Sequence, residues 1–131
     1  MSVPVSLEEI SGAAALHDWF GYWPNFHDAE ILSLHLNRSG TSVLRVHTWE
    51  MTNKLDEKGY YVLEKHTIVE FDLETVHDLS LNGFSQQNVI FELGIEKIDS
   101  GFRVTPQDCY GLAGTLDVCK ISIRVIPGKP S

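Results

Sequence analysis

The chain has 131 residues, of which 43% are apolar, and it carries a formal net charge of −8. This length and composition fit one domain with a buried core and exclude a disordered chain. The acidic charge disfavours nucleic acid and anionic lipid as partners, and no stretch approaches the roughly 20 consecutive apolar residues that a membrane span needs.

The N-terminus and the two cysteines indicate a cytoplasmic protein. Residues 1–4 contain no basic residue and no apolar segment of the kind found in signal peptides. Cys109 and Cys119 lie in strand-like sequence. In a reducing compartment such residues are more commonly buried thiols than a disulfide. We therefore expect a cytoplasmic localisation and two buried, unpaired thiols.

The first predicted element is a helix from about Leu7 to Phe20. Ser6 and Glu9 have the spacing of a capping box, in which each side chain bonds the backbone N–H of the other residue. Apolar residues then recur at near-helical spacing. The helix is expected to end before Gly21, because Pro24 disfavours helical backbone at the residue before it.

Alternation of apolar and polar residues begins at Glu30 and predicts a β-hairpin over residues 30–49. The leucines of its first strand are expected to face the core, whereas Ile31, Ser33 and His35 face outward. A turn over residues 37–41 joins the two strands. If the strands pair in this way, His35 and His47 could lie opposite each other.

The remaining sequence predicts four further strands. A long strand is expected over residues 60–73, followed by a mixed connector over 76–84. A second hairpin combines 89–95 with 102–105, and a last strand covers 116–126. Short turns between consecutive strands predict an antiparallel meander of about six strands.

The predicted fold class is α+β, with the N-terminal helix packed on one face of the antiparallel meander in two layers. We expect a single domain over residues 1–131. The alternation also predicts a buried set of side chains: Leu32, Leu34, Leu36, Leu44, Val46, Phe91, Leu93 and Ile95.

The densest group of reactive side chains is the joint between the helix and the first strand, with Trp23, His27, Asp28 and Glu30. An imidazole and two carboxylates could bind a metal or move a proton. Alternatively they fix the turn, with Asp28 accepting backbone N–H groups. The spacing matches no recognised ligand motif, and nothing else in the chain completes a catalytic set. We therefore expect a structural joint with no catalytic residue, no metal and no cofactor.

Acidic residues concentrate in two tracts of the chain. Residues 1–37 contain five acids and no lysine or arginine, and residues 64–99 contain eight acids and two lysines. Such tracts either keep the protein soluble or steer it toward a basic protein. Its three tryptophans and four tyrosines serve the core and rim or anchor a protein interface. A structural module that pairs through a sheet edge is a further alternative.

The segment Gly21–Ile31, GYWPNFHDAEI, resembles the opening of the immunity protein 50 family of bacterial polymorphic toxin systems. Residues 76–90 and 102–112 are similar to two later segments of that family. The resemblance implies a non-enzymatic protein that binds a cognate toxin in the producing cell. The acidic tracts fit a basic toxin, and the partner-binding residues are unknown. The competing hypothesis is a small metal-dependent or acid–base enzyme that uses His27, Asp28 and Glu30.

Overall fold

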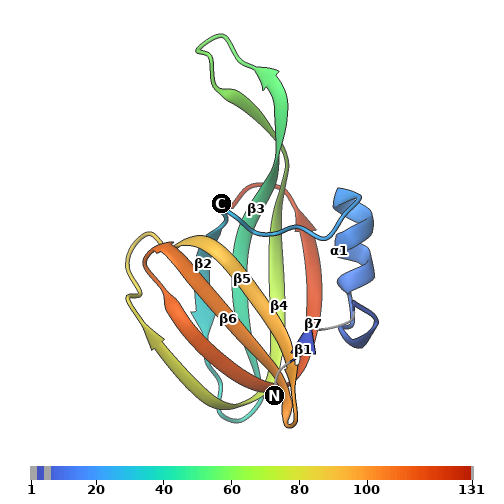
Figure 1. Ribbon diagram of the computed structural model, residues 1–131, viewed down its shortest axis with the longest axis vertical. Coiled ribbons are helices and arrows are strands. Elements are labelled where there is room, and N and C mark those ends of the chain that lie inside the picture. Colours follow the sequence, from blue (N-terminus) through green and yellow to red (C-terminus); the bar gives the residue numbers. More distant parts are fainter. Residues whose placement is uncertain (1–2, 5–6, 131) are drawn as a thin grey trace.

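The computed structural model describes residues 3–4 and 7–130, with side chains described from Glu8 onward (Figure 1). A short strand β1 (Val3–Pro4), a 3-10 turn η1 (Leu7–Glu9) and one helix α1 (Ala13–Phe20) precede six longer strands. These strands are β2 (Glu30–His35), β3 (Thr41–Leu55), β4 (Tyr61–Asn82), β5 (Val89–Ile98), β6 (Gly101–Tyr110) and β7 (Ala113–Pro127). The predicted α+β class, with one helix and six antiparallel strands, is confirmed.

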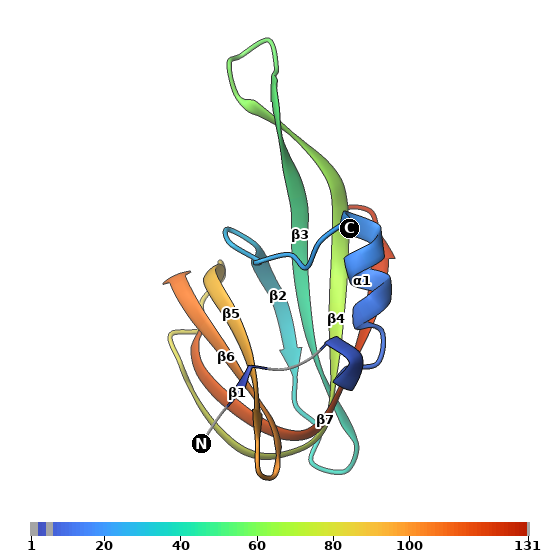
Figure 2. The ribbon, with the colours of Figure 1, turned by 45° about the vertical axis from the view of Figure 1, so that its right-hand side comes forward.

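The six long strands form one sheet that closes on itself. Their order is β5-β2-β3-β4-β7-β6, and β5 also pairs with β6. Consecutive strands form hairpins as predicted, except that β5 does not pair with β4, the strand before it. The segment between them instead carries the chain to the far side of the interior, where β5 joins β2 and β6. Figures 1 and 2 show β5 and β6 on one side of the interior and β3 and β4 on the other.

The core fills the inside of this closed sheet. Side chains of a strand alternate between its two faces, so every second residue of the central strands points inward. Val69, Phe71 and Leu73 on β4 are completely buried, as are Leu116 and Val118 on β7. The helix adds three buried side chains to the same cluster: Ala13, Leu16 and Phe20. The interior is therefore a single apolar core shared by the sheet and the helix.

The helix covers the part of β7 that β6 leaves unpaired. Pairing of β6 with β7 extends only to Val118. Beyond it, Ser11 lies opposite Ser122, and the N–H of Ile123 donates to the Ser11 carbonyl at 2.7 Å. Gly12 has φ 87° and approaches β7 closely. The backbone before α1 thus acts as a short substitute for a paired strand.

The predicted helix boundary at Leu7 is wrong. Leu7 belongs to the turn η1, and the left-handed backbone of Gly12 separates that turn from α1. The apolar spacing could not reveal this break, because Ile10 is buried like a residue of the helix. Glu9 forms an ion pair with Lys97. Ser6 of the predicted capping box lies outside the described residues.

Two bulges change the predicted set of buried residues. In β2 the register shifts between Ile31 and Ser33, so Ile31 faces Val46 in the core. In β5 the register shifts between Ile90 and Glu92, so Ile90 is buried and Phe91, the extra residue, is 52% exposed. Leu36 is 48% exposed because it lies just beyond the end of β2. The predicted burial of Leu36 and Phe91 is therefore wrong.

Of the other six predicted core residues, Leu44, Val46 and Leu93 are buried. Leu34 and Ile95 are partly buried and pack against the core. Leu32 is half-buried. The expected pair His35–His47 does not form, since His47 lies opposite Glu30 and His35 opposite Val43.

The predicted connector after residue 76 is also wrong, because β4 continues as a strand to Asn82. Its last residues pair with the beginning of β7, up to Asn82 opposite Ala113. At the other end, the hairpin of β3 and β4 extends beyond the body of the protein as a two-stranded arm, which we define as residues 50–64 (Figures 1 and 2).

Asn88, immediately before β5, holds the closing segment in place. Its side chain is buried, and Oδ1 accepts the backbone N–H groups of Ser85 at 3.0 Å and Leu112 at 3.1 Å. Its Nδ2 donates to the Ser85 carbonyl. Because Gly111 lies against this side chain, with φ 100° and space for no Cβ, the bend before β7 requires glycine.

We predict that Gly12→Ala destabilises the protein far more than Gly21→Ala. Both glycines have nearly the same left-handed φ, 87° and 85°, so the backbone strain of about 1–2 kcal/mol is shared. A Cβ on Gly12 would lie 1.9 Å from the Ile123 carbonyl oxygen, whereas one on Gly21 would meet nothing within 4 Å. The expected loss for Gly12→Ala is about 3–5 kcal/mol in chemical denaturation. Equal losses would contradict the close contact between the helix start and β7.

Candidate functional site

The joint between α1 and β2, residues 21–29, crosses one end of the closed sheet (Figure 1). Phe26 points inward and is buried, with its ring 5.7 Å from that of Phe71 and 6.2 Å from that of Trp23. Trp23 is partly buried against the core. The aromatic part of the joint therefore seals this end of the core and fixes the polar residues that follow.

The backbone of the joint is held by a turn with two unusual residues. Phe26 and Asp28 both have left-handed backbones, with φ 61° and 67°. The N–H of His27 donates to Asn25 Oδ1 at 2.9 Å, and the N–H of Ala29 donates to the Phe26 carbonyl at 3.0 Å. The side chain that accepts a backbone N–H here belongs to Asn25, which takes the role that the sequence assigned to Asp28.

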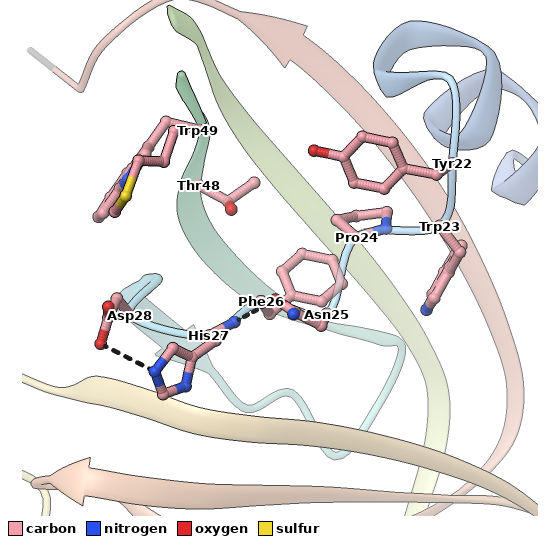
Figure 3. Close-up of a pocket in the computed structure, with 10 residues that line it drawn as sticks. Tyr22, Trp23, Pro24, Asn25, Phe26, His27, Asp28, Thr48 and Trp49 are labelled. Carbon is pink, nitrogen blue, oxygen red and sulfur yellow. Dashed lines mark hydrogen bonds and ion pairs between the residues drawn. The ribbon is translucent and has the colours of Figure 1, made fainter. Parts of the chain in front are cut away.

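His27 is oriented by a contact with β5. Its Nδ1 lies 3.0 Å from the carbonyl oxygen of Phe91, and its ring lies edge-on to the Phe91 ring at 5.5 Å. A carbonyl can only accept, so Nδ1 must carry the proton in this contact. Nε2 then faces Asp28, whose Oδ1 is 3.6 Å away (Figure 3).

Cys109 joins these two residues, although nothing in the sequence connected it with them. The register of β5 and β6 shifts at Val89 and Ile90, leaving Cys109 between two paired residues of β6. One ligand-type atom each of His27, Asp28 and Cys109 lies within 4.8 Å of the others. Glu30 is not part of this group; it begins β2 and lies opposite Val89.

The expected burial of the two cysteines is wrong, because both side chains are exposed. Both are also free, as the sequence predicted. Cys119 lies on β7, in the stretch just beyond the residues that pair with β6. Cysteine as a residue type favours burial. The exposure of these two thiols therefore follows only from the position of each residue in the sheet.

A pocket of about 320 Å³ lies between the joint and β3. Its walls include four aromatic side chains, and Figure 3 shows three of them, Tyr22, Trp23 and Trp49, around it, with His27 and Asp28 at one side. Thr48 and Met51 of β3 complete the lining. Such a wall offers apolar contact area more than acid–base chemistry.

Next to this pocket, His47 and His66 form a stacked pair. His47 Nε2 lies 3.1 Å from His66 Nδ1, and Trp49 packs 5.0 Å from the His47 ring. Partial burial lowers the pKa of both imidazoles below the usual value. The neighbouring His66 lowers the pKa of His47 further, and Lys129 acts on both. The fold therefore favours the neutral pair.

We predict that this pair makes the protein less stable in mild acid. The pKa values of these two imidazoles are lower in the folded protein than in the unfolded chain, where a histidine has a pKa of about 6.5. As the pH falls through that value, the unfolded chain therefore binds more protons than the folded protein. The free energy of unfolding should fall as the pH drops through that value and level off below the folded pKa values. The decrease between pH 7.5 and 5 should shrink when His47 and His66 are both changed to Gln. His35→Gln serves as the control, and an unchanged decrease in the double variant would contradict the prediction.

Arginines neutralise part of the second acidic tract. Arg45 Nε lies 2.8 Å from Glu70, and Arg124 reaches both Glu70 at 3.1 Å and Asp72 at 2.7 Å. Arg103 pairs similarly with Asp117 on β7 and holds the pKa of that carboxyl below its usual range. These pairs lie across neighbouring strands. The free acidic charge on the sheet is therefore smaller than the sequence alone indicates.

The closed antiparallel sheet, with one short helix and an aromatic joint at one end, defines a small α+β protein. Residues 12–127 match the family described as Immunity protein 50. The chain belongs to this immunity protein family. The comparisons found no matching curated protein and no matching solved structure. None of the described helices combines the length and the apolar character that a membrane span requires.

Proposed function

We propose that this chain acts as one immunity domain, over residues 1–131, that binds and neutralises a cognate toxin domain without catalysis. The observation that carries the proposal is the family match over residues 12–127. An immunity family implies a toxin partner in general. The proposal places the protein in the cytoplasm of the producing cell and gives it no role with nucleic acid or membranes.

The arm offers the most prominent surface for such a partner. It projects from the body (Figure 2), and it carries five exposed large apolar side chains: Met51, Leu55, Tyr60, Tyr61 and Leu63. Exposed apolar groups that gather in one place mark interaction sites. Tyrosine is also enriched among the residues that dominate binding energy. We therefore assign the toxin contact to the arm.

The net charge supports a basic partner. A charge of −8 on 131 residues creates a negative field around the whole protein. The arm itself mixes both signs, with Lys54 and Lys58 beside Asp56 and Glu57. In this proposal the charge of the body attracts the toxin from a distance, and the apolar side chains of the arm hold it after contact.

We predict that Tyr60→Ala and Tyr61→Ala each accelerate dissociation of the cognate toxin domain by about tenfold or more, which corresponds to about 1.4 kcal/mol. The toxin domain encoded next to this gene would be used in surface plasmon resonance. Phe84→Ala is the matched control, because Phe84 is as exposed as the two tyrosines but follows the opposite end of β4. If the chain neither binds nor protects against that toxin, the immunity proposal fails. If Phe84→Ala weakens binding as much as the arm variants, the arm is not the contact.

The association rate with the same toxin domain should fall steeply as salt rises. Exposed charges are screened beyond a Debye length of about 10 Å at 0.1 M ionic strength, so steering by the acidic field weakens. The dissociation rate should change much less. An association rate that does not respond to salt would remove the argument for a basic partner and leave the arm contact standing.

A further inference from the structure

We propose that His27, Asp28 and Cys109 form a surface site for one zinc ion. The three residues come from the joint and from β6, which are remote in sequence. Their ligand-type atoms nevertheless lie within 4.8 Å of one another. The sequence predicts a metal-free joint because the spacing of its residues matches no recognised ligand motif, and it gives no reason to place Cys109 there. The inference is independent of the toxin proposal.

The positions of the three residues are fixed by backbone pairing around Ile90. On one side, the N–H of Asp28 donates to the Ile90 carbonyl, and the N–H of Ile90 donates to Ala29, both at 2.8 Å. On the other side, Ile90 lies opposite Asp108, the residue before Cys109. The site therefore belongs to a three-stranded part of the sheet, and it forms only when the sheet closes.

The ring of His27 is already oriented as that of a metal ligand. Its Nδ1 donates to the Phe91 carbonyl at 3.0 Å, so Nε2 is the nitrogen that could bind a metal. Histidine ligands of zinc commonly donate their second nitrogen to a carbonyl or carboxylate in this way, which fixes the tautomer and the ring orientation. Nε2 is also the nitrogen that faces Asp28.

The three side chains can all bind one cation. An imidazole nitrogen, a carboxylate oxygen and, once its proton is lost, a cysteine sulfur are all electron-pair donors. Among the described residues, no lysine or arginine pairs with Asp28; His27 Nε2 lies 3.6 Å from its Oδ1. A proton on His27 could pair with the Asp28 carboxylate, but it would not bind the Cys109 sulfur. A single divalent ion satisfies all three.

The donor set favours zinc. Thiolate, imidazole and carboxylate are its usual ligands, at about 2.0–2.3 Å in tetrahedral geometry. That geometry separates ligand atoms by roughly 3.5 Å, so the present group has to contract by about 1 Å through rotation of exposed side chains. Three protein ligands leave a fourth position for water. Binding displaces the thiol proton of Cys109 to solvent, so affinity should rise with pH.

Cobalt(II) titration of the full chain tests the site directly. Co²⁺ replaces Zn²⁺ in such sites, and its bond to a thiolate produces an ultraviolet charge-transfer absorption. The protein would be stripped with chelator, reduced, and titrated without oxygen. Cys109→Ser removes the proposed sulfur ligand, and Cys119→Ser is the matched control, because both cysteines are free and exposed. Asp28→Asn removes the carboxylate but keeps a residue that tolerates the left-handed backbone.

The expected result is a thiolate band that saturates at one Co²⁺ per chain and disappears when Zn²⁺ is added. The band should persist in Cys119→Ser, vanish in Cys109→Ser, and require at least about tenfold more Co²⁺ in Asp28→Asn, in line with the loss of a ligand. In the unaltered protein, Zn²⁺ should also protect Cys109 from alkylation and leave Cys119 reactive. This second measurement uses only the unaltered protein, so its result does not depend on whether a variant folds.

Three results would overturn the inference. The first is the absence of a thiolate band in the unaltered protein. The second is an equal band in Cys109→Ser, which would assign the metal elsewhere. The third is equal alkylation of both cysteines with and without Zn²⁺.

Discussion

The structure depends on the closure of the sheet between the joint and β5. Three backbone hydrogen bonds near this point are independent of side-chain type: they link Asp28, Ala29 and Ile31 to the segment 88–90. Without them β2 would be an edge strand, and the core beneath Phe26 would be open at one end. The left-handed residues of the joint serve this closure, because they turn the chain so that its N–H groups point toward β5.

The closure also explains which parts of the fold could be predicted from the sequence. Alternation is a local signal, and it located β3, the middle of β4 and both strands of the second hairpin. It failed where a single inserted residue reverses the two faces, as at Leu32 and Phe91. It also missed the extension of β4 to Asn82, because exposed residues of a strand on the outside of a curved sheet look like a connector.

Only part of the candidate site could be predicted from the sequence, again because the sequence signals are local. His27 and Asp28 are close in sequence and could be found by their chemistry. Cys109 and the buried Asn88 act through pairing partners that are remote along the chain. Asn88 resembles an ordinary turn residue, and only its bonds across the closing segment distinguish it.

The arm has a consequence for how copies of this chain meet. Within the body, β3 pairs with β2 only as far as His47, and β4 pairs with β7 only from Thr67 onward. Within the described residues, the arm beyond these positions therefore has two hydrogen-bonding edges that no other strand covers. Such edges are templates for strand addition in any sheet protein. Lysines and acids are distributed along the arm. They make edge-to-edge pairing of identical copies unfavourable wherever like charges meet. The same charges that disfavour pairing between copies leave the edges of the arm open to a strand of different composition.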